Sequence, residues 1–281
     1  MTHSRFILKT SPMRLPILVV LCSAAAMQAQ PPFYTDDPAV TERGKFHFEF
    51  FDEFDALHPL QYPNLRQNTA NYKLNYGLPH NLELDVDAPY LSIFRVLGTP
   101  NSIGAGDLNL GIKWNFHKES SDSKMPALGA SLYIEFPTGD SRQQLGSGLT
   151  DYWLNLIAQK TILPKTRLTG NAGYLFAGNT STGVLGITTT RGHVFAGGLS
   201  LLHDFSDRLA LGGEVYGGLS TNDALGRSQL QGMLGGQYGL RNGMTFNFGI
   251  LGGVYIATPR IGGQAGISVD FPDAFRKIQR K

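Results

Sequence analysis

Residues 71–90 read NYKLNYGLPHNLELDVDAPY, two alternating arms around a central Gly-Leu-Pro-His. In the first arm, Tyr72, Leu74 and Tyr76 alternate with polar residues, and in the second arm Leu and Val alternate with acids. Successive side chains of a strand point to opposite faces, so the pattern predicts a β-hairpin with one apolar and one polar face. Gly77 and Pro79 mark its turn. The hairpin alone leaves open whether a protein core, a partner or lipid covers the apolar face.

The same alternation recurs along the chain and predicts twelve strands, most of them about ten residues long. They cover residues 45–54, 71–76, 81–90, 107–116, 127–136, 152–161, 167–176, 192–205, 208–219, 229–240, 244–255 and 260–271. In the last five strands, apolar and polar faces are hard to distinguish, because 18 of the 34 glycines lie between Gly197 and Gly266. In 192–205, His193 and Leu201 would share a face, which indicates a bulge.

The connections between these strands tend to alternate in length. Tight turns are predicted at 77–80, 162–165, 204–207 and 240–243, long loops at 55–69, 91–105, 137–149 and 177–190, and an intermediate one at 220–228. The long connection 117–126 and the short connection 256–259 break the rule. Short turns at one end, loops at the other and strands long enough to span a bilayer predict an all-β, transmembrane, antiparallel up-and-down β-barrel.

The N-terminus predicts a secretory signal peptide over residues 1–29. Arg5, Lys9 and Arg14 are basic, the apolar stretch after them is too short to span a bilayer, and Ala29 suits cleavage. Residues 30–43 are then an irregular periplasmic segment leading into the barrel, residues 44–271 the barrel, and residues 272–281 a basic C-terminal tail. Without the leader's three basic residues, 21 of the 24 remain against 22 acids. This near-neutral balance predicts no nucleic-acid partner.

Metal and cofactor chemistry have no sequence signature. The single cysteine, Cys22, lies in the leader, and the histidines are scattered without metal-binding spacing. A lipid-hydrolysing barrel would need a Ser beside a His near the outer membrane edge. His203 and Ser206 have the residue types, but they fall at a predicted periplasmic turn and are typical of turn chemistry. We therefore expect no catalytic residues, no metal and no cofactor.

The polar strand faces predict a charged lumen, with outer-membrane lipid against the apolar faces. Aromatic residues at both predicted strand ends agree with two membrane interfaces, although a soluble sandwich could also carry aromatics there. Twelve strands enclose space for water. For any single charged side chain, bridging across the lumen is favoured over contact with solute. The candidate lumen-lining residues are Lys73, Glu83, Asp85, Asp87, Asn109, Lys113, Glu135, Arg167 and Glu214.

Four motifs resemble one known family. Pro32–Pro38 reads PFYTDDP, the hairpin carries NYGL, LEL and PY, Gly104–Lys113 reads GAGDLNLGIK, and Pro137–Asp140 reads PTGD. Together they resemble the outer-membrane transporters catalogued as "MetA-pathway of phenol degradation", over nearly all of the chain after the leader. The resemblance implies a barrel in the outer membrane of a Gram-negative-type bacterium. It also implies a role in passing small compounds, apolar or aromatic ones among them, and no binding residues are transferred.

Three classes of function therefore remain. The favoured one is a channel or transporter that passes small compounds by diffusion. The alternatives are a lipid-modifying hydrolase barrel and a structural or adhesive barrel without transport. Solute flux across a bilayer would separate the first from the last.

Overall fold

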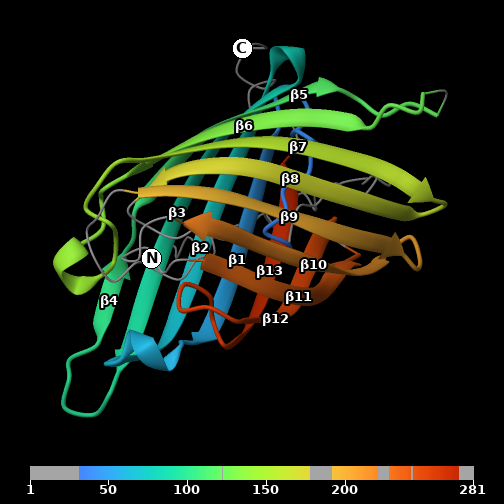
Figure 1. Cartoon of the computed structure of the whole chain (residues 1–281). Coiled ribbons are helices and arrows are strands. Elements are labelled where there is room, and N and C mark those ends of the chain that lie inside the picture. The colour runs from blue at the N-terminus through green and yellow to red at the C-terminus, as the bar shows by residue number, and fades with distance from the viewer. Residues whose placement is uncertain (1–31, 122, 178–191, 221–227, 242, 272–281) are drawn as a thin grey trace, which may run out of the picture.

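A computed structural model describes residues 32–121, 123–177, 192–220, 228–241 and 243–271. It is a closed antiparallel barrel of twelve strands, in which each strand pairs with its neighbour in sequence and β1 closes the barrel against β13 (Figure 1). The strands are β1 (Phe46–Ala56), β2 (Asn64–Leu78), β3 (Leu82–Arg95), β4 (Ser102–Ala105), β5 (Leu108–His117), β6 (Ala127–Phe136), β7 (Asp151–Leu163), β8 (Thr166–Ala177), β9 (Gly192–Asp204), β10 (Leu209–Ser220), β11 (Ser228–Gly239), β12 (Met244–Gly253) and β13 (Ile261–Phe271). The short β4 pairs with the end of β3 and is not part of the closed ring.

The predicted hairpin at residues 71–90 is confirmed within β2 and β3. A 3-10 turn, η2 (Pro79–Asn81), joins the strands, and Tyr72 pairs with Ala88. Tyr72 and Leu74 are 47% and 41% exposed on the outer wall, whereas Asp85 on the inner face is 0% exposed. The apolar face therefore points away from the barrel and the acidic face into it, because neighbouring positions of a strand take opposite sides.

The structure corrects three expectations. Residues 91–105 are not a loop throughout, since β3 continues to Arg95 and β4 pairs back onto it. β2 begins at Asn64, seven residues before the predicted start. The bulge expected in 192–205 is wrong: β9 pairs with β8 and β10 in unbroken register, and His193 and Leu201 both lie on the outer face. His193 lies near the loop end of β9 and contacts the Tyr174 hydroxyl there, so its place on the outer face does not need a bulge.

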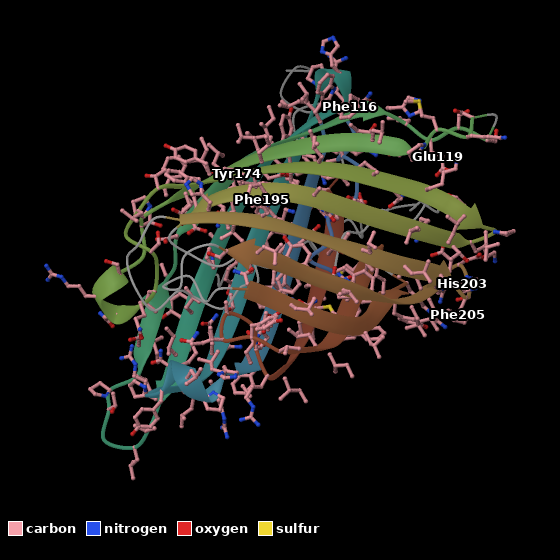
Figure 2. All side chains as sticks on the ribbon, viewed as in Figure 1. Phe116, Glu119, Tyr174, Phe195, His203 and Phe205 are labelled. Carbon is pink, nitrogen blue, oxygen red and sulfur yellow. The ribbon has the colours of Figure 1, made fainter. Side chains whose placement is uncertain are left out.

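The two ends of the barrel differ in their connections. The turn end carries η2, the two residues between β7 and β8, and residues 205–208; the loop end carries residues 57–63 and 137–150. Exposed aromatic side chains lie near both ends of the outer wall, with Phe116 and Phe205 toward the turn end and Phe195 toward the loop end (Figure 2). Aromatic rings in two belts are typical of barrels that cross a membrane. Most of the predicted loops at 177–190 and 220–228 lies outside the described residues.

Helices contribute little to the described residues. The structure has η1 (Pro59–Gln61), η2 and η3 (Ser141–Gln143), each three residues long. Within the described ranges, no helix has the length and apolar character needed to cross a bilayer.

Candidate functional site

The lumen holds residues 32–43, which we call the luminal segment. It runs irregularly inside the barrel and reaches the turn end, where the Gly44 amide donates to Gly77 O at 2.8 Å and the Gly77 amide donates to Lys45 O at 3.1 Å. The sequence indicated an irregular segment before the first strand but gave no sign that it would fill the barrel. The inner faces of the strands therefore meet protein over part of the lumen.

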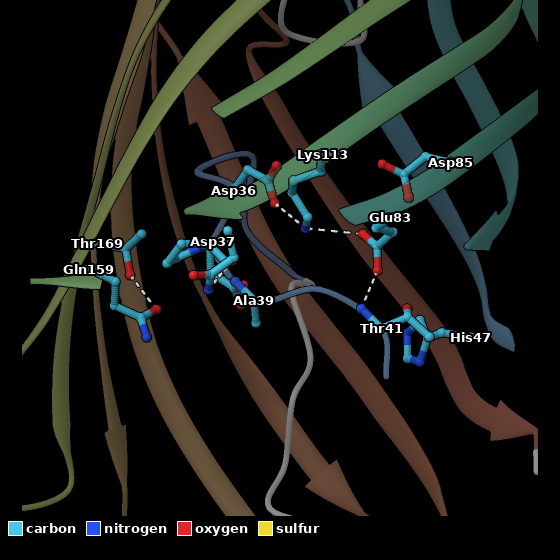
Figure 3. Close-up of polar contacts among 12 residues, drawn as sticks. Asp36, Asp37, Ala39, Thr41, His47, Glu83, Asp85, Lys113, Gln159 and Thr169 are labelled. Carbon is cyan, nitrogen blue, oxygen red and sulfur yellow. Dashed lines mark hydrogen bonds and ion pairs between the residues drawn. The ribbon is translucent and has the colours of Figure 1, made fainter. Parts of the chain in front are cut away.

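Ion pairs join the luminal segment to β3 and β5. Lys113 Nζ lies 3.3 Å from both Asp36 Oδ1 and Glu83 Oε1, and Glu83 also accepts the amide of Thr41 (Figure 3). Lys113 is 0% exposed and Glu83 is 2% exposed. A buried charge is tolerated only when it is paired and hydrogen-bonded. Glu83 and Lys113, two of the candidate lumen-lining residues, thus pair with each other and with the luminal segment.

Glu214 holds the opposite end of the luminal segment. Its carboxylate accepts the backbone amides of Tyr34 at 2.9 Å and Thr35 at 2.7 Å. The Tyr34 hydroxyl in turn donates to Glu53 Oε1 at 2.6 Å. Hydrogen bonds to a carboxylate are about twice as strong as neutral ones. Glu214 therefore positions the backbone, a role that its place in an alternating strand did not reveal.

Inner-face glycines make room for the luminal segment on three strands. A Cβ atom on Gly198 would lie 2.6 Å from Thr35 Oγ1, one on Gly235 would lie 2.8 Å from Pro32 Cγ, and one on Gly129 would lie 3.2 Å from Pro38 Cβ. Atoms this close would have to shift, because packed interiors leave no spare volume. Two of the glycines that obscure the strand pattern in the sequence, Gly198 and Gly235, thus lie where the segment contacts the wall.

The other predicted lumen-lining residues divide into three groups. Asp85 is fully buried and accepts the Tyr133 hydroxyl at 2.8 Å. Arg167 pairs with Asp204 at 2.8 Å where β8 and β9 meet the turn end, and so it does not join the other candidates. Lys73, Asp87, Asn109 and Glu135 line an internal cavity.

This cavity has a volume of about 330 Å³ and lies between the luminal segment and the wall. Its apolar lining includes Phe33, Phe51, Leu91, Trp153 and Leu175. Its ionisable lining consists of Asp36, Glu49, Glu53, Lys73, Asp87, Asp107 and Glu135, with Tyr34 and Tyr133. Mixed apolar walls with a few convergent polar groups are typical of small-molecule sites.

The loop after β6 folds toward the cavity and joins two of the sequence motifs. Asp107 of GAGDLNLGIK accepts the Gly139 amide at 2.9 Å and the Ser147 amide at 2.8 Å, and Gly139 belongs to PTGD. Leu145 of the same loop is 3% exposed and packs on Leu91 and Ile93 inside the barrel. The two motifs therefore form one structural unit that holds residues 137–149 against the barrel wall.

Asp37 of the luminal segment lies outside the strands, and the pKa of its carboxyl is shifted. Burial inside the lumen raises the pKa of its carboxyl to about 6, while the positive charge of Lys113 acts in the opposite direction. The Ala39 amide donates to Asp37 Oδ1 at 2.7 Å. The carboxylate therefore stabilises a local turn of the segment at neutral pH.

His203 and Ser206, the residues considered for a hydrolase site, take part in turn contacts. The His203 ring lies 2.8 Å from the Thr166 hydroxyl, and Ser206 Oγ accepts the amides of Arg208 and Leu209, which is the turn chemistry expected from the sequence. Across the described part of the chain, no three His, Cys, Asp or Glu side chains are grouped to hold a metal ion.

Comparisons with known proteins agree with the barrel. The sequence profile of a family described as "Putative MetA-pathway of phenol degradation" matches residues 61–271. No curated protein sequence matches the chain. Among solved structures, the COG4313 outer membrane channel from Pseudomonas putida F1 is similar, with 14% identity over 84% of this chain and 98% of that chain, and a TM-score of 0.62.

Two porins are also similar in fold. The NanC porin has 10% identity over 79% of this chain and 98% of that chain, with a TM-score of 0.52. The KdgM porin in complex with disordered oligogalacturonate has 8% identity over 80% of this chain and 99% of that chain, with a TM-score of 0.52. These likenesses establish the architecture and leave the contents of the lumen to be interpreted from this chain.

Proposed function

Because the chain belongs to the family described as "Putative MetA-pathway of phenol degradation", we propose that it is an outer-membrane channel for small compounds. The observation that carries the proposal is the partly filled lumen: a closed, outwardly apolar barrel holds a cavity of about 330 Å³ with a mixed lining. A cavity of this size suits compounds of the size of a substituted benzene ring. Polar groups on the same wall would orient them.

Apolar and aromatic compounds fit the lining. Phe33, Phe51 and Trp153 provide faces on which a ring can stack, and such contacts are worth about 0.5–1.5 kcal/mol beyond burial. The luminal segment narrows the path, which favours diffusion of single small molecules over oligomers. A hydrolase role has no comparable support, since His203 and Ser206 take part in turn contacts at the turn end.

Purified protein in liposomes tests the proposal. It should be extracted by detergent, migrate differently on denaturing gels before and after boiling, and admit small neutral aromatic compounds on addition outside the vesicles. Liposomes made with the boiled protein are the control. A folded barrel that passes neither ions nor these compounds would favour the structural or adhesive alternative.

The orientation of the barrel is part of the same proposal. We infer that the loop end faces the cell exterior, because long loops lie outside in such barrels. An epitope inserted at Asn101 should be labelled on intact cells, and one inserted at Pro79 should not. Gln144 is a less suitable site, since its side chain accepts hydrogen bonds from Asn64 and Arg95. The reverse labelling pattern would invert the topology.

A further inference from the structure

Acidic side chains follow one row of paired residues across half of the barrel. Their Cα atoms are register partners from β1 to β7, and each side chain lies on the inner face. The row consists of Glu49, Lys73, Asp87, Asn109, Glu135 and Asp151. Because barrel strands tilt against the axis, the row climbs from near the turn end at Glu49 to the loop end at Asp151. Lys73 is its one cation among four carboxylates.

An apolar row runs directly beside the acidic row. Tyr133, Trp153 and Leu175 are register partners on β6, β7 and β8. Tyr133 lies two residues from Glu135 on the same face, and Trp153 lies two residues from Asp151. These two acids therefore each have an aromatic neighbour about 7 Å away along the strand. A molecule that follows the wall therefore meets negative charge and apolar surface side by side.

Glu53 is a buried carboxylate of this cavity, placed where a positive ligand group would contact it. Its side chain is 3% exposed and lines the cavity. Oε1 accepts the Tyr34 hydroxyl, whereas Oε2 has no hydrogen-bond partner among the described residues. Asp55, two residues along the same face, is 0% exposed, and its carboxyl faces that of Glu53; among the described residues, neither acid forms an ion pair with a cation. Two adjacent buried carboxylates are costly unless a cation or a hydrogen-bond donor reaches them.

Phe51 completes the environment of Glu53. It lies two residues before Glu53 on the same face and lines the same cavity, together with Phe33 of the luminal segment. Aromatic faces attract ammonium groups as well as apolar bodies. The residues around Glu53 thus match an ammonium group attached to an apolar body.

We propose that the cavity binds small organic cations with an aromatic body, with the ammonium at Glu53 and the ring against Phe51 and Phe33. This inference rests on the proposed function, since it names a class of solute for the channel. The acidic row makes cations the favoured class over anions along the approach from the loop end. Neutral aromatic alcohols share the ring contacts but lack the charge that the buried carboxylate requires.

Three probes of one shape test the class without any mutation. They are 2-phenylethylammonium, 2-phenylethanol and phenylacetate, titrated into the purified detergent-solubilised barrel by calorimetry. We expect the ammonium compound to bind at least about tenfold more tightly than the alcohol, a difference of about 1.4 kcal/mol. Phenylacetate should bind most weakly of the three. Equal binding of ammonium and alcohol, or tighter binding of phenylacetate, would overturn the proposal.

A charge-removing variant locates the site. Glu53→Gln keeps the acceptor for the Tyr34 hydroxyl and should abolish the preference for ammonium over alcohol. The matched control is Asp85→Asn, which removes an equally buried luminal charge that does not line the cavity and should leave the preference intact. If both variants lose the preference equally, the summed negative charge of the lumen selects the cation. The proposal that the ammonium group binds at Glu53 is then contradicted.

Binding and conduction are measured separately, so the two proposals fail separately. Ammonium-selective binding by a barrel that does not conduct would leave this inference standing and contradict the channel. Conduction of small ions and neutral aromatics without ammonium-selective binding would keep the channel and contradict this inference.

Discussion

The two halves of the barrel wall hold the luminal segment by different means. The wall from β1 to β7 presents buried charges, such as Glu83 and Lys113, which bond to the segment directly. The wall from β8 to β13 presents inner-face glycines, such as Gly198 and Gly235, which let the segment approach closely, with Glu214 as the charged anchor. Charged contacts predominate on the first side, where Gly129 also packs closely on the segment, whereas close packing and the Glu214 hydrogen bonds act together on the second.

Removing the luminal segment should have the largest effect, because both halves then lose their common partner. Deletion of residues 32–41 leaves residues 1–31 and all strands intact and should raise single-channel conductance several-fold in planar bilayers. Unchanged conductance of the deletion variant would mean that the segment is not the element that narrows the pore.

Among single substitutions, removal of a buried charge on the β1–β7 wall should destabilise the protein most. Lys113→Met leaves Glu83 and Asp36 without their cation, and loss of one partner of a buried pair costs about 3–5 kcal/mol. Urea unfolding of the protein in lipid vesicles measures the change in free energy of unfolding. Lys118→Met, at an exposed position, is the control and should change it little. A change for Lys113→Met as small as that for Lys118→Met would mean that water already screens the charges inside the lumen.

Loosening the loop after β6 should have an intermediate and local effect. Asp107→Ala removes two charge-assisted hydrogen bonds, each worth about 1.5–3 kcal/mol. We expect faster cleavage by trypsin after Arg142 in the folded protein, read by gel electrophoresis. Asp207→Ala, on an exposed turn, should leave the cleavage rate unchanged. Unchanged cleavage in Asp107→Ala would show that the Leu145 contact holds the loop by itself.

Replacing an inner-face glycine by alanine should have the smallest effect on the free energy of unfolding. In Gly198→Ala the new methyl group lies 2.6 Å from both Thr35 Oγ1 and Tyr216 Cδ2, so side chains must move, at a cost of about 1–3 kcal/mol. The same urea assay measures it. In Gly232→Ala the nearest atom, Glu214 O, lies 3.7 Å away, and no loss is expected. Equal stability of the two variants would mean that the segment does not pack closely on this half.

The sequence predicted strand faces better in the charged half, but strand bounds better in the glycine half, where β8 to β13 all lie within two residues of the predicted ranges. Alternating charged and apolar residues define both faces of a strand, and β6 matches its predicted bounds, residues 127–136, residue for residue. In β9, glycine removes the contrast between the faces, and a bulge was inferred that the unbroken register contradicts.

The luminal segment could not be predicted because irregular backbone has no periodicity. Its contacts depend on residues far away in sequence: Tyr34 and Glu214 are 180 positions apart. One usable signal was present, namely glycines at inner-face positions such as Gly198 and Gly235, where a barrel wall would otherwise carry side chains. The cavity residue Glu53 was likewise missed, because its strand was judged by its phenylalanines.

The pairing of β1 with β13 imposes an order on folding. The ring cannot close until Ile261–Phe271 is available, and every residue of the luminal segment has emerged by then. Pairing between the first and last strands is as non-local as a contact can be, so it is slow to form. Residues 32–41 must therefore either be wrapped by the wall as it curls, or thread into a finished ring from the turn end. In the first case the segment acts as a template for its own enclosure. A barrel that lacked it would then close at a different rate and not only conduct differently.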